Sequence, residues 1–268
     1  FRSILFNSFS DISIFLLFYF MTMQEKNYKI ICGLLFANII NLVIPIMRGQ
    51  RSGVALAFLT IICGYFLFKQ YLSKRLNKFI KKVGIVFIVV ITLPVAAITI
   101  SRFGSEKGGI AAFINWYIGQ GNIYFNNYGL DDNGIRYGDR TLNLFKRLVD
   151  SKTSMNYVER REIYSNLKIN DEVFSTFVGD FTIDFGPFFA VIIFIVFNFV
   201  VIDSFQKNKI NNNKVKLYQL LLLYFTVCIS AQGGMYLFSY SDTGNLRIIA
   251  LGMLYYYLKY HEALLKKF

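Results

Sequence analysis

The chain has 268 residues, of which 55% are hydrophobic, 18% are aromatic and only 17% are charged. Soluble domains carry about 25% charged residues, so this composition excludes disorder, collagen and a coiled coil and argues against a soluble globule. The formal net charge of +13 can indicate nucleic-acid binding. Beside long apolar segments, basic loops instead orient a membrane protein and contact anionic lipids, so we expect membrane lipids and no nucleic acid as partners.

Long apolar segments recur along the chain and predict an all-α polytopic membrane protein. A membrane-spanning helix needs about 20 mostly apolar residues. Seven segments approach this length: residues 3–23, 29–47, 53–72, 83–101, 187–204, 217–238 and 245–260. We therefore predict transmembrane helices 1–4 in residues 1–101, a large extracytoplasmic loop with amphipathic helices in 102–186, and transmembrane helices 5–7 with a cytoplasmic tail in 187–268.

The basic residues predict which side of the membrane each loop faces. Segments 73–82 and 205–216 and the C-terminus are rich in Lys, which places them in the cytoplasm. That side holds 14 of the 18 Lys but only one Arg, Arg75, whereas the other 10 Arg lie outside. Because Arg binds phosphate in a bidentate manner, this sorting indicates a phosphorylated ligand on the outer face. Anchoring of these side chains at lipid headgroups is the alternative.

The first part of the outer loop, GGIAAFINWYIGQGNIYFNNYG, is aromatic and nearly uncharged. Trp116, Tyr117 and Tyr124 are candidate glycan-binding residues, because sugar rings present apolar faces to aromatic side chains. The alternative is an aromatic belt at the membrane interface. The next part, TLNLFKRLVD, predicts a short amphipathic helix with Asp139 or Thr141 as N-cap.

The rest of the outer loop is predicted from local signals. The segment MNYVERREIYSNL is helical in character and charged. Gly129, Gly134 and Gly138 mark turns.

Arginines are the candidate ligands for a phosphorylated substrate. Arg48 and Arg51 flank the outer turn MRGQRSG, where one helical turn would place both on one face. Arg136 and Arg140 are four residues apart in the outer loop, where a solvated charged face is the alternative. Arg247 lies at the outer end of the last apolar segment, where the alternative is an ion pair with an acidic residue.

Two carboxylates precede the fifth apolar segment, in GDFTIDFGP. Asp180 and Asp184 are four residues apart, so a helix would turn both toward one cavity. Either is a candidate general base, and helix capping is the alternative for Asp184, with Pro187 at the first helical position. No nucleotide-binding or metal-binding motif is present, so we expect neither a cofactor nor a metal.

These motifs resemble the bacterial oligosaccharide repeat-unit polymerases of O-antigen and capsule synthesis, the Wzy type. The likeness is carried by MRGQRSG, by YIGQGNIYFNN followed by YGDRTLNLFKRL, and by STFVGDFTIDFGPFF, which together span about residues 40–205. Members of this family have more than seven spans. Because the first residue is Phe1, we expect an N-terminally truncated fragment.

The resemblance implies a fold like the class C membrane glycosyltransferases and a place in the bacterial cytoplasmic membrane with a cytoplasmic C-terminus. The enzyme would transfer growing glycan from undecaprenyl pyrophosphate to a sugar hydroxyl of a new lipid-linked repeat unit. Arg48, Arg51, Arg247, Arg136 and Arg140 would bind the pyrophosphate. Asp184 or Asp180 would take the hydroxyl proton. A chain-length regulator and a flippase are the expected protein partners.

Three other functions fit the same residues. An O-antigen ligase would use an outer-loop histidine, whereas the one histidine here, His261, is predicted to be cytoplasmic. A transporter or lipid-linked glycan flippase would carry ionisable residues deep in its spans and paired halves with broken helices. A non-catalytic membrane subunit is the third alternative.

Overall fold

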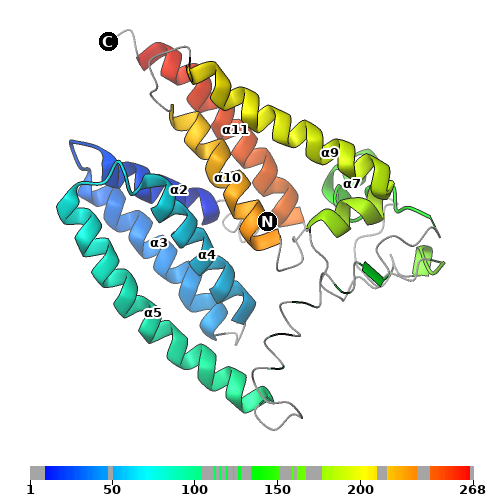
Figure 1. Cartoon of the computed structure of the whole chain (residues 1–268), viewed down its shortest axis with the longest axis horizontal. Helices are drawn as coiled ribbons and strands as arrows, with labels where there is room; N and C mark the ends of the chain where they lie inside the picture. Colours follow the sequence, from blue (N-terminus) through cyan, green and yellow to red (C-terminus); the bar gives the residue numbers. More distant parts are fainter. Residues whose placement is uncertain are drawn as a thin grey trace. The chain divides into compact units, whose positions relative to one another are not determined.

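The computed structural model describes residues 10–47, 51–103, 134–150, 162–166, 177–209, 216–233 and 242–265, with single positions between 112 and 159. Within these residues all regular structure is helical (Figure 1), which confirms the all-α prediction. Each of the seven predicted apolar segments coincides with a helix over most of its length. The helices are α2 (Ser10–Thr22), α3 (Tyr28–Met47), α4 (Arg51–Phe68), α5 (Lys74–Phe103), α7 (Asn143–Val149), α9 (Phe177–Lys209), α10 (Leu217–Gly233) and α11 (Asp242–Leu265).

Two described helices are long and apolar enough to cross a membrane: Tyr28–Met47 and Gly179–Asp203. Three shorter apolar stretches, Ile12–Thr22, Gly53–Phe68 and Leu217–Cys228, fall below the length of a span. The prediction that the chain contains apolar helices long enough to cross a membrane is therefore confirmed for these two helices. The count of seven crossings stays a prediction.

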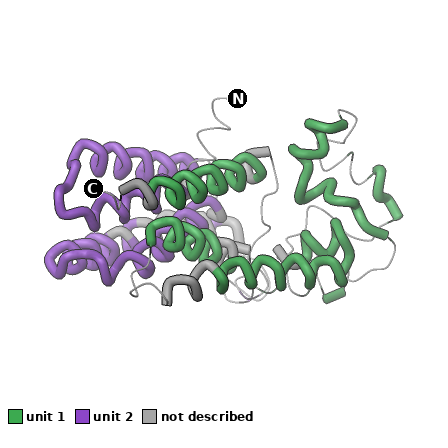
Figure 2. The backbone as a smooth tube through the Cα atoms, turned by 90° about the horizontal axis from the view of Figure 1, so that it is seen from above, with its two compact units in different colours: residues 1–9, 119–268 green, residues 10–118 purple. Residues whose placement is uncertain are grey.

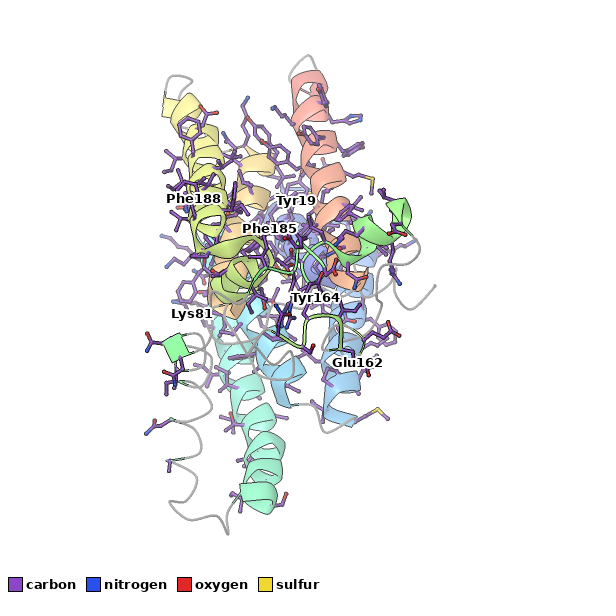
Figure 3. All side chains as sticks on the ribbon, turned by 90° about the vertical axis from the view of Figure 1, so that its right-hand side faces the viewer. Tyr19, Lys81, Glu162, Tyr164, Phe185 and Phe188 are labelled. Atoms are coloured by element: carbon purple, nitrogen blue, oxygen red, sulfur yellow. The ribbon has the colours of Figure 1, made fainter. Side chains whose placement is uncertain are left out.

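The long apolar helices leave most of their side chains exposed. Only 17% of the apolar window in α3 and 6% of that in α9 is buried. On α9, Phe188 is 73% exposed and Phe199 is 69% exposed (Figure 3 draws the side chains and labels Phe188). A core helix of a soluble protein buries such residues, so this exposure favours contact with lipid.

The chain divides into two compact units (Figure 2). Unit 2, residues 10–118, contains α2–α5, and α2, α3 and α4 pack against one another. Aromatic rings fill the contact: the Phe15 and Phe68 centroids lie 5.2 Å apart, and the Phe18 ring stacks on Phe68. Gly64 permits this approach, because a Cβ there would lie 2.7 Å from the Phe18 ring.

Unit 1 comprises the described residues from 119 onward. Within it, α10 packs against both α9 and α11, and α11 contacts α7.

Helix α9 is broken near its start. Gly186 has φ 81° and ψ 162°, so the segment before it and the segment that begins at Pro187 are separate helices (Figure 1). The ring centroids of Phe181 and Phe194 are 5.8 Å apart. Thirteen residues of straight helix would separate them by about 20 Å, so the first segment folds back against the second. The predicted span at 187–204 begins at this break.

Candidate functional site

The candidate site forms where the outer loop meets the first segment of α9. Three successive backbone features reverse the loop, because Gly134, Tyr137 and Gly138 have φ values of 119°, 52° and 80°. Glycine adopts such angles without strain. Gly138 lies in a turn, which confirms that prediction, whereas Gly134 has a positive φ but lies in no assigned turn and Gly129 lies outside the described residues. The N–H of Arg136 then donates to the carbonyl oxygen of Ile183 at 3.1 Å, which attaches the loop to α9.

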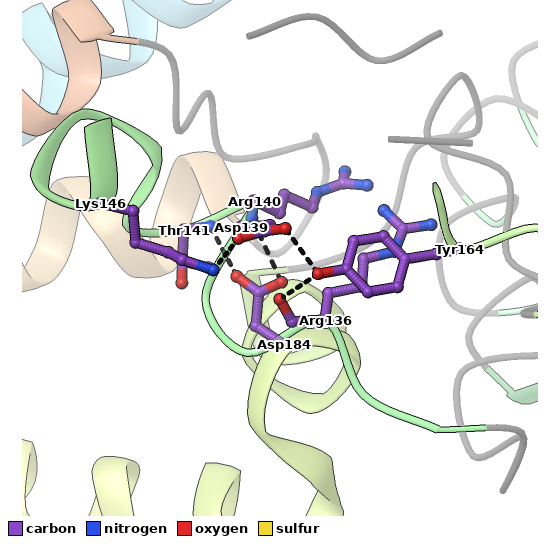
Figure 4. Close-up of polar contacts among 7 residues, drawn as sticks. All are labelled: Arg136, Asp139, Arg140, Thr141, Lys146, Tyr164 and Asp184. Carbon is purple, nitrogen blue, oxygen red and sulfur yellow. Dashed lines mark hydrogen bonds and ion pairs between the residues drawn. The ribbon is translucent and has the colours of Figure 1, made fainter. Parts of the chain in front are cut away.

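Asp184 holds the backbone of this loop. Its Oδ1 accepts the N–H of Arg140 at 3.3 Å, and its Oδ2 accepts the N–H of Thr141 at 2.6 Å (Figure 4). The side chain is completely buried. The two successive amides replace part of the hydration that the buried carboxyl loses. Asp184 thus binds the backbone of the loop that precedes α7, whereas the sequence suggested that it caps the helix that begins at Pro187.

Asp180 fixes the Arg140 side chain. Its Oδ1 lies 2.7 Å from Nε of Arg140, and the two side chains are 0% and 6% exposed. As the four-residue spacing predicted, Asp180 and Asp184 turn toward the same part of the chain. One carboxylate therefore binds the guanidinium of residue 140, while the other binds its amide.

Asp139 links two further groups to the loop. It forms an ion pair with Nζ of Lys146, and the hydroxyl of Tyr164 donates to its Oδ2 at 2.5 Å. The same hydroxyl is 3.1 Å from the carbonyl oxygen of Arg136, whose guanidinium lies 5.8 Å from the Tyr164 ring centroid. Burial and the nearby Asp184 charge raise the pKa of Tyr164, although the Arg136 charge opposes this. The hydroxyl therefore remains a neutral donor at physiological pH.

A third helix reaches the loop through Asn245 of α11. Its Nδ2 donates to the carbonyl oxygen of Thr141 at 3.0 Å, and its Oδ1 accepts the N–H of Leu144 at 3.3 Å. The Asn245 side chain is 0% exposed. Both ends of this amide thus join the start of α11 to the start of α7. Arg247 lies two residues further along α11 and is half-buried.

Equal numbers of positive and negative side chains meet in this cluster. Arg136, Arg140 and Lys146 are its basic members, and Asp139, Asp180 and Asp184 are its acidic members. Buried charges are tolerated when they are paired and hydrogen-bonded. In the described part of the chain, no group of three or more His, Cys, Asp or Glu side chains could hold a metal ion.

The structure brings together four of the predicted site residues: Arg136, Arg140, Asp180 and Asp184. It places Arg247 on α11 in the same compact unit, and it places Arg51 at the start of α4, in the other unit. The remaining candidates, Arg48, Trp116, Tyr117 and Tyr124, lie outside the described residues.

The short amphipathic helix starts one residue later than an N-cap at Thr141 predicts and three residues later than an N-cap at Asp139 predicts. Helix α7 begins at Asn143 after Leu142, which makes no side-chain cap. Asp139 and Thr141 do not cap it, because the Asp139 carboxylate binds Lys146 and Tyr164 and the amide of Thr141 binds Asp184. Competing partners from other parts of the chain thus override the local capping signal.

Sequence reasoning also missed four members of the cluster: Thr141 as a partner of Asp184, and Lys146, Tyr164 and Asn245. The seven-residue interval from Asp139 to Lys146 was the one local signal, since it corresponds to about two helical turns. The chain matches no protein-family model, no curated protein and no solved structure in the comparisons made.

Proposed function

We propose that this chain polymerises lipid-linked oligosaccharide repeat units on the outer face of the bacterial cytoplasmic membrane. A sugar hydroxyl of a new repeat unit attacks the anomeric carbon of the growing glycan, and the hydroxyl proton passes through solvent to the departing pyrophosphate. The bond from that carbon to undecaprenyl pyrophosphate breaks, and the carrier leaves with the electron pair. The membrane topology expected for this reaction has seven crossings and a cytoplasmic C-terminus.

The observation that carries the proposal is the fixed guanidinium of Arg140 beside the break in α9. Asp180 holds its Nε at 2.7 Å in a buried setting. The exposed apolar surface of α9, including Phe188 and Phe189, begins two residues after Gly186. A ligand with a diphosphate head and a long prenyl chain suits a fixed guanidinium next to an apolar helix.

Charge balance indicates what else the ligand needs. Acidic and basic side chains are equal in number in this cluster, and Asp180 and Asp139 already pair with Arg140 and Lys146, so the cluster offers little free positive charge to a diphosphate. Additional cations must come from elsewhere, and the half-buried Arg247 of the same unit is the described candidate. Arg48 and Arg51 stay predicted ligands. Positioned guanidinium groups stabilise the charge that builds on the departing pyrophosphate without a metal ion.

The predicted role of the two carboxylates as general bases is the least supported part of the mechanism. A general base must come within hydrogen-bonding reach of the attacking hydroxyl. Asp180 and Asp184 are 0% exposed and are bonded to residues 140 and 141. Catalysis in this proposal therefore depends chiefly on orientation and on stabilisation of the leaving group.

Arg140→Lys tests the proposal, because lysine keeps the charge and loses the planar fork. In cells that supply the lipid-linked repeat unit, we expect the ladder of glycan lengths to collapse to single units. Arg75→Lys, an exposed position on α5 on the predicted cytoplasmic side, is the matched control and should leave the ladder intact. A full ladder from stably inserted Arg140→Lys protein would count against the proposal.

A transporter or lipid-linked glycan flippase is the second candidate, and one observation favours it. The break at Gly186 divides an apolar helix that also carries two buried carboxylates, and broken helices with ionisable residues are typical of transporters. Reconstituted vesicles separate the two functions. A flippase would move labelled lipid-linked units across the bilayer without lengthening them, whereas a polymerase lengthens units that are already on the outer side.

A further inference from the structure

Two buried side chains hold the backbone that leads into α7, and they come from two different helices. Asp184 of α9 accepts the N–H groups of Arg140 and Thr141. Asn245 of α11 accepts the N–H of Leu144 and donates to the carbonyl oxygen of Thr141. Both side chains are 0% exposed. Four hydrogen bonds therefore fix five residues of backbone around Arg140.

We propose that Asp184 and Asn245 are positioning residues, which act on the ligand through Arg140 by fixing the backbone that carries it. The inference rests on the proposed function, in which Arg140 contributes to binding the carrier pyrophosphate. Asp180 forms an ion pair with the guanidinium of Arg140. The guanidinium keeps its orientation toward the ligand only while the backbone amide of Arg140 stays in place. A displacement of about 1 Å in such a group can lower a rate by about a hundredfold.

Asn245 separates this role from general-base catalysis. Its amide cannot take a proton from a sugar hydroxyl, yet it holds the same backbone as Asp184. Loss of a general base lowers kcat and removes a limb of its pH profile. Loss of a positioning residue weakens substrate binding and loosens the loop. If both side chains act by positioning, substituting either one gives the same pattern of change.

The test uses Asp184→Asn and Asn245→Leu in the full chain, purified in lipid nanodiscs and supplied with lipid-linked repeat units. We expect both variants to lower kcat/KM about tenfold or more, as the loss of a buried hydrogen bond implies. The shape of the kcat–pH profile should not change. Asp203→Asn, which removes a carboxylate from the other end of α9, is the matched control and should behave like the wild type.

Limited trypsin digestion measures how accessible the loop around Arg140 is and does not depend on enzymatic activity. The bond after Arg140 is buried in the wild type, and we expect both variants to be cleaved there several-fold faster. Unchanged cleavage in both variants would overturn the positioning role. The positioning role would also be overturned if Asp184→Asn lowered kcat at an unchanged KM while Asn245→Leu kept wild-type kinetics, because that pattern identifies Asp184 as a general base.

The outcomes distinguish this inference from the proposed function. Wild-type protein that forms no polymer would refute the function, while trypsin cleavage would still decide whether the two side chains hold the loop. If Asp184→Asn does not accumulate in the membrane, Asn245→Leu alone decides the result, because faster cleavage supports the role and unchanged cleavage contradicts it.

Discussion

Replacing only one member of the buried ion pair between Arg140 and Asp180 should lower the free energy of unfolding far more than replacing both members with apolar residues. Asp180→Asn leaves a buried guanidinium without its 2.7 Å carboxylate partner. Breaking a buried pair in this way costs about 3–5 kcal/mol. At roughly 2–4 °C per kcal/mol for a domain of 150–250 residues, the melting temperature should fall by roughly 6–20 °C. The double variant Arg140→Met/Asp180→Leu removes both charges and should recover most of this loss.

Thermal unfolding of the purified chain in detergent micelles measures both effects in one series. Asp203→Asn, on the same helix, controls for the loss of a carboxylate outside the cluster. The double variant should be stable but inactive, since it lacks the guanidinium. A fall of less than 2 °C for Asp180→Asn would refute the reasoning, because it would mean that water reaches the pair and screens it. A double variant less stable than both single variants would refute it as well.

Three further predictions concern other parts of the chain. Folding raises the pKa of Tyr164 above its ordinary 10.0. The contribution of this hydroxyl to stability is therefore complete below pH 10 and is lost as the pH rises through the raised pKa. Denaturant titrations from pH 9 to 11 should show this loss of stability, and Tyr164→Phe should abolish the pH dependence. Gly64→Ala should destabilise unit 2 by about 1–3 kcal/mol through overpacking. Gly33→Ala, where a Cβ would have no atom within 4 Å, should instead stabilise it by about 0.5–1 kcal/mol. Urea titrations in which both variants shift stability in the same direction would contradict the packing account. Single cysteines in place of Lys78 and Asp150 should react with an impermeant thiol reagent from opposite sides of the membrane, and reaction from one side would overturn the predicted topology.

Much of the fold could be predicted because its signals are local. A continuous apolar segment forms a helix whatever its neighbours are, since the helix satisfies its own backbone hydrogen bonds. The described part of each of the seven predicted segments therefore lies wholly or mostly in a helix. Gly134 and Gly138 were predicted as turns for the same reason, because the requirement for positive φ lies in the residue itself.

The site was predicted in part. The spacing of Asp180 and Asp184 indicated that they share a face, and both contact residue 140. The hydrogen bonds of Asn245 to Thr141 and Leu144 join residues about a hundred positions apart. No local pattern in one sequence specifies such a contact. Asp139 was predicted as a helix cap because capping is a local signal, but its actual partners, Lys146 and Tyr164, are brought to it by folding.

Release of the carrier lipid tests the central claim most directly. Purified chain in nanodiscs, given synthetic undecaprenyl-pyrophosphate-linked repeat units with no nucleotide and with a metal chelator, is followed for glycan length and for free undecaprenyl pyrophosphate. The account predicts one molecule of free undecaprenyl pyrophosphate for each glycosidic bond formed, and neither product with Arg140→Lys. Intact lipid-linked units that the wild-type chain neither lengthens nor cleaves, in a preparation that nonetheless binds them, would contradict it.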